Sequence, residues 1–182
     1  MPASSSSSPA ANPGDGCMVG LFWVTGGRVY VGTPPGDTAP GVLLSPVGVR
    51  VVGDEPRGWR WAELLDVQVD DVPVRSTSVR WATHALTVAA AAFDMWAPDG
   101  PGQMTVALTT KEGERATAPV LSGAAVAYSQ REVDLSLGLL ARFVRGELSP
   151  SVLSQWWDEI RPGQVLRSRE REAVLEGWFR GE

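Results

Sequence analysis

The stretch of sequence that most restricts the fold is GWRWAELLDVQVDDVPV, which occupies residues 58–74. Trp59 and Trp61 are two positions apart, so both point to the same side if this part of the chain is a strand. The residues AELL that follow favour one helical turn. The valines of DVQVD then alternate with polar residues, a period of two that is typical of a half-buried strand. The stretch therefore predicts a strand, one helical turn and a second strand that ends by Pro73.

The two tryptophans of this stretch have two interpretations. A pair of aromatic rings on one face can stack a ligand, but aromatic side chains are also the largest contributors to small cores. No polar side chains gather beside Trp59 and Trp61 in the sequence, and a ligand site needs such groups to orient its ligand. We therefore assign both side chains to the core.

Charge and composition limit the classes of partner. The chain has 16 Lys and Arg against 21 Asp and Glu, a net charge of −5, which argues against nucleic-acid binding through phosphates. A hydrophobic content of 43% is sufficient for a folded core. The single cysteine, Cys17, cannot form an intrachain disulfide, which is typical of a reducing compartment. Because the chain has neither a secretory signal pattern nor an apolar run of ~20 residues, we expect a soluble, cytoplasmic protein that is not integral to a membrane.

Turn residues divide much of the chain into hairpins. Residues 1–16 are rich in Ser, Pro and Ala and are expected to form a flexible tail. Beyond this tail, apolar runs alternate with short segments that contain Gly or Pro, which favour tight turns. The expected strand pairs are 18–24 with 28–32 across Thr25-Gly26-Gly27, 42–44 with 47–52 across Ser45-Pro46, and 103–109 with 114–120 across Lys111-Glu112-Gly113.

Two longer segments carry helical patterns. Residues 76–96 place apolar side chains three and four positions apart, which predicts a helix between the second and third hairpins. After the third hairpin, Ser129 and Glu132 form a capping box, a pattern typical of the first turn of a helix. An apolar face follows, and Gly146 is placed to end this helix.

The C-terminal residues predict two shorter helices. Ser149 and Pro150 favour the start of one helix, and Ser168 is expected to cap another that continues to about Arg180. Both carry tryptophans, and helices this short are not stable alone in water. They must therefore dock on the rest of the domain or on another chain.

The runs GVLLSPVGVRVV and GWRWAELLDVQV resemble the bacterial pleckstrin-homology-like (PH-like) pattern, in which a strand pair around GV-x-V precedes a W-x-E-L-x-x-V strand. The resemblance implies an α+β fold with a PH-like antiparallel half-barrel or two-sheet core, an inserted helix and a C-terminal capping helix. The helix at 76–96 and the Trp-rich tail are departures from this pattern. The expected segments are a disordered tail at 1–16, a PH-like domain at 17–146 and a short helical extension at 147–182. The whole chain also resembles hypothetical proteins of filamentous actinobacteria, which implies no activity.

Residue types that commonly carry catalysis are few and isolated. The only histidine, His84, falls within the apolar helix pattern, whereas a metal site or catalytic triad needs partners. Cys17 has no base indicated nearby, and one His with one Cys cannot complete a tetrahedral zinc site. Asp70 and Asp71 are adjacent, so on a strand they point to opposite faces. We therefore predict no catalytic residues, no metal and no cofactor.

The function that the sequence favours is a non-enzymatic protein-interaction or scaffold module. The C-terminal extension carries more apolar surface than two short helices can hide, and tryptophan is a frequent interface anchor. The predicted partner-binding residues are Trp156, Trp157, Leu175, Trp178 and Phe179. The partner is an unidentified protein, and a homo-oligomer is an open alternative. The alternative functions are a carboxylate-dependent hydrolase and a peripheral membrane-associated binder, although the negative net charge argues against the latter.

Overall fold

The computed structural model describes residues 16–36, 40–53, 55–75, 102–124, 127–159 and 164–181. The predicted tail up to residue 15 and the predicted helix at 76–96, with His84, lie outside these residues. Within them the chain forms an α+β fold with two antiparallel sheets and three α-helices, which confirms the predicted class.

The first sheet is a meander in which each strand pairs with the next one along the chain. Its strands are β1 (Cys17–Val19), β2 (Phe22–Thr25), β3 (Arg28–Val31), β4 (Gly41–Leu44), β5 (Gly48–Val52) and β6 (Arg57–Arg60). The predicted hairpins β2–β3 and β4–β5 are both present. Val29 and Val31 of β3 are both buried, as their spacing requires if one face of the sheet meets the core.

The first strand pair corrects the predicted single strand at 18–24. The chain turns back between β1 and β2, so that Met18 pairs with Trp23. Gly20 at the turn has a φ of +57°, a conformation that glycine adopts without steric penalty. The NH of the next residue, Leu21, donates to Ser136 Oγ at 3.1 Å. A hydrogen bond to Ser136, which lies far along the chain, therefore fixes the turn at Gly20 within the apolar run at 18–24.

The second sheet follows directly from the first through the stretch rich in tryptophan. A 3-10 turn, η2 (Trp61–Glu63), joins β6 to β7 (Leu64–Asp70), as the sequence predicts. Strands β8 (Gln103–Thr110) and β9 (Arg115–Leu121) complete the order β7-β8-β9. In β7 the predicted alternation is present, with Val67 and Val69 buried and the polar residues between and after them exposed.

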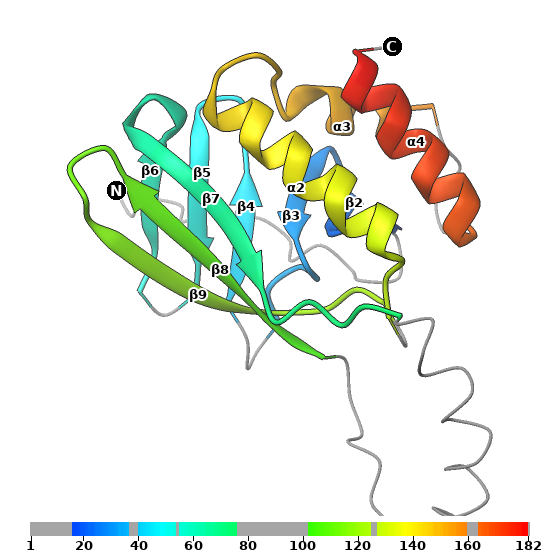
Figure 1. The fold of residues 1–182 in the computed structure, drawn as a ribbon, viewed down its shortest axis with the longest axis horizontal. Helices are drawn as coiled ribbons and strands as arrows, with labels where there is room; N and C mark the ends of the chain where they lie inside the picture. Colours follow the sequence, from blue (N-terminus) through cyan, green and yellow to red (C-terminus); the bar gives the residue numbers. More distant parts are fainter. Residues whose placement is uncertain are drawn as a thin grey trace, which may run out of the picture.

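The helices are α2 (Gln130–Val144), α3 (Ser151–Trp157) and α4 (Ser168–Arg180). Figure 1 shows α2 lying across the sheets, with α3 and α4 on the side of α2 that is away from β8 and β9. The Phe143 ring of α2 lies 6.5 Å from that of Phe22 in β2 and 5.8 Å from that of Trp61 in η2, between ring centroids. Helix α2 therefore contacts both the first sheet and the junction between the sheets. None of the helices in the described part of the chain is sufficiently long and apolar to cross a membrane.

The C-terminal helices dock on the chain's own body, which is one of the two possibilities that the sequence leaves open. Leu153 of α3, Leu175 and Trp178 of α4, and Leu166 between these helices are buried in the same core cluster as the strands. Helix α4 packs beside α2 and reaches β1, while α3 packs on β2 and β3. The predicted extension at 147–182 thus contributes to the core of the domain.

Candidate functional site

Trp59 and Trp61, the two tryptophans of residues 58–74, lie in the core cluster. Trp61 donates its indole NH to the carbonyl oxygen of Ser45 at 2.8 Å, so its polar atom is satisfied inside the protein. Trp59 is buried in β6, and the guanidinium carbon of Arg57 lies 5.2 Å from its ring centroid. Neither indole forms an open ring face for a ligand.

The five residues predicted to bind a partner divide between the core and the surface. Leu175 and Trp178 are buried, and Leu175 packs against Gly20 in the first turn of the sheet. Trp156 is half-buried and meets Trp178 edge to face, with a centroid distance of 5.3 Å. Side chains as buried as those of Leu175 and Trp178 cannot reach a second protein while α4 stays packed. Leu175 and Trp178 therefore hold α4 against the rest of the domain.

Phe179 is the member of this set with the most exposed side chain. Trp157 is half-buried, and Phe179 remains 40% exposed, although phenylalanine is usually buried. The Phe179 ring lies over Gly138 of α2, where a Cβ would come within 2.8 Å of the ring. The guanidinium carbon of Arg142 lies 5.4 Å from the ring centroid, and Arg142 also donates to the Phe179 carbonyl oxygen. The exposed ring is therefore held in a fixed position between α2 and α4.

A buried ion pair joins the same two helices. The Glu132 side chain in the first turn of α2 has no solvent exposure, and its carboxylate accepts a hydrogen bond from Nε of Arg171 in α4. The backbone NH of Ser129 donates to the Glu132 carboxylate at 2.8 Å, and the Ser168 hydroxyl donates to it at 2.9 Å. Arg171 uses Nη1 to donate to the Leu166 carbonyl oxygen at 2.6 Å. Each charge is thus paired and hydrogen-bonded, the condition under which buried charges are tolerated.

This cluster corrects the role predicted for Ser168. Helix α4 does begin at Ser168, but Arg167 is the N-cap residue, and its backbone NH donates to the Glu170 carboxylate at 2.7 Å. The Ser168 hydroxyl instead donates to Glu132, 36 positions earlier in the chain. The capping-box pattern did identify Glu132, but only as a residue that caps α2.

The environment shifts the pKa values of the buried groups Glu132 and Cys17. Burial by itself would raise the pKa of Glu132, but the hydrogen bond and charge of Arg171, with the NH of Ser129 and the hydroxyl of Ser168, lower that pKa below its usual value. Burial raises the pKa of the Cys17 thiol, against the smaller opposing effects of the Leu166 backbone and the Arg171 charge. Glu132 is therefore ionised and Cys17 is a neutral thiol at neutral pH.

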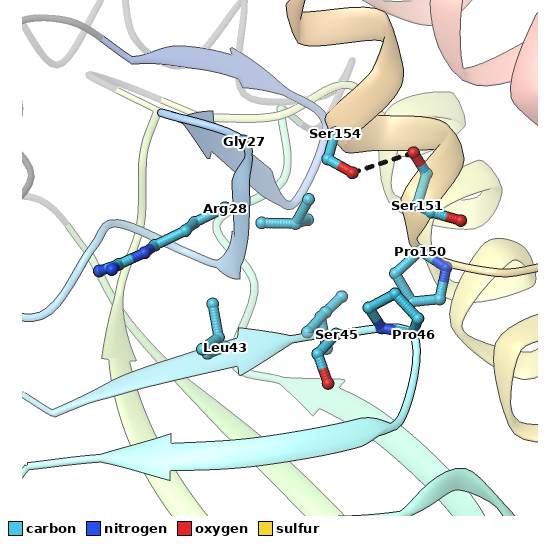
Figure 2. Close-up of a pocket in the computed structure, with 10 residues that line it drawn as sticks. Gly27, Arg28, Leu43, Ser45, Pro46, Pro150, Ser151 and Ser154 are labelled. Atoms are coloured by element: carbon cyan, nitrogen blue, oxygen red, sulfur yellow. Dashed lines mark hydrogen bonds between the residues drawn. The ribbon is translucent and has the colours of Figure 1, made fainter.

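Two crevices open between the sheets and the C-terminal segment. Figure 2 shows the smaller one, of about 150 Å³, which is lined by Leu43 of β4, by Ser45 in the turn after β4, and by Pro150, Ser151 and Ser154 of the α3 region. The Ser154 hydroxyl donates to the Ser151 carbonyl oxygen at 3.0 Å, so its proton is already used in a hydrogen bond within α3. This volume is smaller than most small-molecule pockets, which measure ~300–1,000 Å³.

The larger crevice, of about 290 Å³, lies where β1, β2 and the start of α4 meet the connections that follow β7, β9 and α3. Met18, Trp23 and Leu166 give it apolar walls, and Val165, which is 90% exposed, lies at its edge. Its lining also includes Arg75, Gln164 and Arg171. Among the described residues that line either crevice, none is an Asp or a Glu. The described residues also contain no cluster of three or more His, Cys, Asp or Glu that could hold a metal ion.

Comparisons with protein-family models, with curated proteins and with solved structures found no match for this chain. Its function is therefore inferred from the residues described above.

Proposed function

We propose that this protein is a non-enzymatic binding module that contacts a partner protein through its C-terminal helices. The observation that carries the proposal is the exposed Phe179 ring, which α2 and α4 hold in one position. A side chain that is already ordered loses less conformational entropy on binding than a mobile one. Aromatic residues, phenylalanine among them, are enriched in the cores of protein interfaces.

The charges around Phe179 favour an acidic partner. Arg142 and Arg145 lie at the C-terminal end of α2 and share one carboxylate, that of Glu147, at 3.3 and 2.5 Å. Two guanidinium groups at one carboxylate leave this end of α2 with a local positive charge, on a chain whose net charge is −5. We infer a partner that presents an apolar side chain flanked by carboxylates, because opposite charges favour encounter and orientation.

The PH-like assignment belongs to the same proposal. It is supported by the succession of antiparallel strands, by the one-turn junction η2, and by a capping-box helix that packs across both sheets. The packing of α3 and α4 into the core departs from the PH-like pattern, which the Trp-rich C-terminal segment lies outside. The hydrolase and membrane-binding alternatives have no comparable support, because the described residues that line the two crevices include no carboxylate and the net charge is negative.

The binding proposal is tested by affinity capture with three forms of the protein. The wild type and Phe179→Ala are compared with Leu65→Ala, a matched control that removes an apolar side chain 62% exposed on β7. A protein captured by the wild type and by Leu65→Ala, but not by Phe179→Ala, is then purified and its affinity for all three forms is measured. We expect Phe179→Ala to weaken binding about tenfold or more and added salt to weaken it further.

Two results would contradict this proposal. Equal binding by the wild type and Phe179→Ala would remove Phe179 from the interface. Analytical ultracentrifugation that shows a dimer of the wild type, dissociated by Phe179→Ala, would make a second copy of the chain the occupant of this surface. Thermal unfolding of each variant provides the control that α4 remains packed.

A further inference from the structure

The larger crevice has a lining that differs in charge from the rest of the chain. Among the described residues that line it, two are arginines, one is a glutamine and none is an Asp or a Glu. The chain as a whole carries more acidic than basic residues, 21 against 16. The polar side-chain groups in this crevice are thus mainly hydrogen-bond donors, set among apolar walls.

The two arginines have different environments. Arg171 is nearly buried, and its guanidinium is held by Glu132 and by the Leu166 carbonyl oxygen. Arg75 is exposed and forms no ion pair with the residues that the structure describes. Its backbone is fixed, because the Arg75 NH donates to the Tyr128 carbonyl oxygen at 2.8 Å. Among the described residues, the Arg75 guanidinium therefore has no counter-ion, and its backbone is anchored at the crevice wall.

The apolar part of the crevice includes one donor that has no acceptor. The indole nitrogen of Trp23 is buried and makes no hydrogen bond in the described structure. Burial of an unpaired donor costs about 1–3 kcal/mol, and native proteins contain few such groups. Trp23 lines the crevice beside Met18, so its ring supplies apolar contact area as well as the unpaired NH.

From this lining we propose that the crevice binds a small organic anion, with its apolar part against Met18, Trp23 and Val165 and its anionic group at Arg75 and Gln164. A volume of about 290 Å³ is close to the lower end of the range of small-molecule pockets. Arginine is suited to this role because its guanidinium presents parallel donors to a carboxylate or a phosphate. The described lining residues include no carboxylate that would repel an anion. This site is separate from the surface around Phe179, so either proposal can fail alone.

The test measures binding of matched probes to the full chain by calorimetry and by amide chemical shifts. Phenylacetate and phenyl phosphate carry the two anionic groups, and phenylacetamide is the neutral analogue of the first. We expect millimolar or tighter binding of at least one anion, with binding of phenylacetamide about tenfold weaker or more. Chemical-shift changes are expected at Arg75, Gln164 and Val165.

Three variants separate this site from non-specific binding. Arg75→Gln removes the free charge and is expected to weaken anion binding about tenfold, whereas Arg75→Lys retains part of it. Arg28→Gln removes an exposed arginine that lines the smaller crevice, so it is the matched control and is expected to bind as the wild type. Ala127→Leu places a larger side chain in the crevice wall and is expected to reduce binding of all probes.

The outcomes decide between the proposal and its alternatives. Failure of both anions to bind at millimolar concentration would overturn it. Binding that Arg75→Gln and Arg28→Gln weaken equally would also overturn it, since the attraction would then be a general effect of charge. Unfolding temperatures of the variants show whether any loss of binding comes from loss of structure, and Arg75→Gln, which changes an exposed side chain, keeps the test informative if Ala127→Leu does not fold.

Discussion

The substitution Glu132→Gln tests how α4 is held to the domain. Glutamine has nearly the shape of glutamate, so the change removes charge without leaving a cavity. The Glu132 carboxylate accepts hydrogen bonds from Arg171, Ser129 and Ser168. The single amide oxygen of glutamine cannot replace both carboxylate oxygens, and the amide NH₂ would face donors. Arg171 would remain buried with its charge uncompensated.

The magnitude follows from this burial. Removal of one partner of a buried ion pair destabilises a protein by about 3–5 kcal/mol, because the other charge is left without a counter-ion. The same two helices provide a matched control in Arg131 and Glu176, whose side chains are 62% and 34% exposed and whose closest atoms are 2.5 Å apart. Exposed pairs contribute about 0–1 kcal/mol, so Glu176→Gln is expected to have a small effect.

The assay is equilibrium unfolding in urea, followed by circular dichroism and by tryptophan fluorescence. Domains of this size are stable by about 5–15 kcal/mol, so Glu132→Gln should remove a large fraction of the free energy of unfolding. The double variant Glu132→Gln with Arg171→Met should recover part of the loss, since no buried charge then remains. An effect of Glu132→Gln no larger than that of Glu176→Gln would refute the reasoning.

Three further predictions concern stability and reactivity. The pKa of Glu132 is lower in the folded state than in the unfolded chain. The stabilisation by the Glu132 carboxylate is therefore complete above the unfolded pKa and is lost as the pH falls through the folded pKa. When the free energy of unfolding is measured as a function of pH, its decrease in acid should be smaller for Glu132→Gln than for the wild type. The Cys17 thiol is buried and its pKa is raised, so alkylation by iodoacetamide at pH 8 should be slow until urea unfolds the chain, and rapid labelling of the native protein would contradict its burial. Gly20→Ala and Gly26→Ala both place a Cβ at positive φ, which costs about 1–2 kcal/mol at each position. Only at Gly20 would the new Cβ also come within 2.3 Å of Ser136 Oγ, so Gly20→Ala should lower the unfolding temperature more than Gly26→Ala. Equal effects would contradict the packing of the first turn on α2.

Local patterns predicted most of the strands and the start of α2. Alternation of apolar residues located β7 and β8, and the capping box of Ser129 with Glu132 located the first residue of α2 within one position. These features depend on neighbours in sequence, which is why the sequence is sufficient. The turn at Gly20 was not predicted, because the apolar residues around it are compatible with one continuous strand and the turn depends on Ser136.

The candidate site was less predictable from the sequence, because it depends on which helix faces and which distant segments of the chain pack against each other. Spacing indicated that Leu175 and Trp178 lie on the apolar face of a helix, but it did not indicate whether that face meets the same chain or another protein. Nothing local pairs Glu132 with Arg171, since the two are 39 positions apart. Likewise, Arg75 and Gln164 meet at one crevice only because connections from different parts of the chain converge there.

The most direct test of this account is hydrogen exchange of the backbone amides of α4 in the native, isolated protein. If Leu175, Trp178 and the ion pair of Glu132 with Arg171 hold α4 to the domain, its amides should exchange as slowly as those of α2, with both helices opening together. Exchange of α4 at the rate of an unfolded peptide, while α2 remains protected, would show that the helix is a detached tail and would contradict the fixed position of Phe179 on which the proposed function depends.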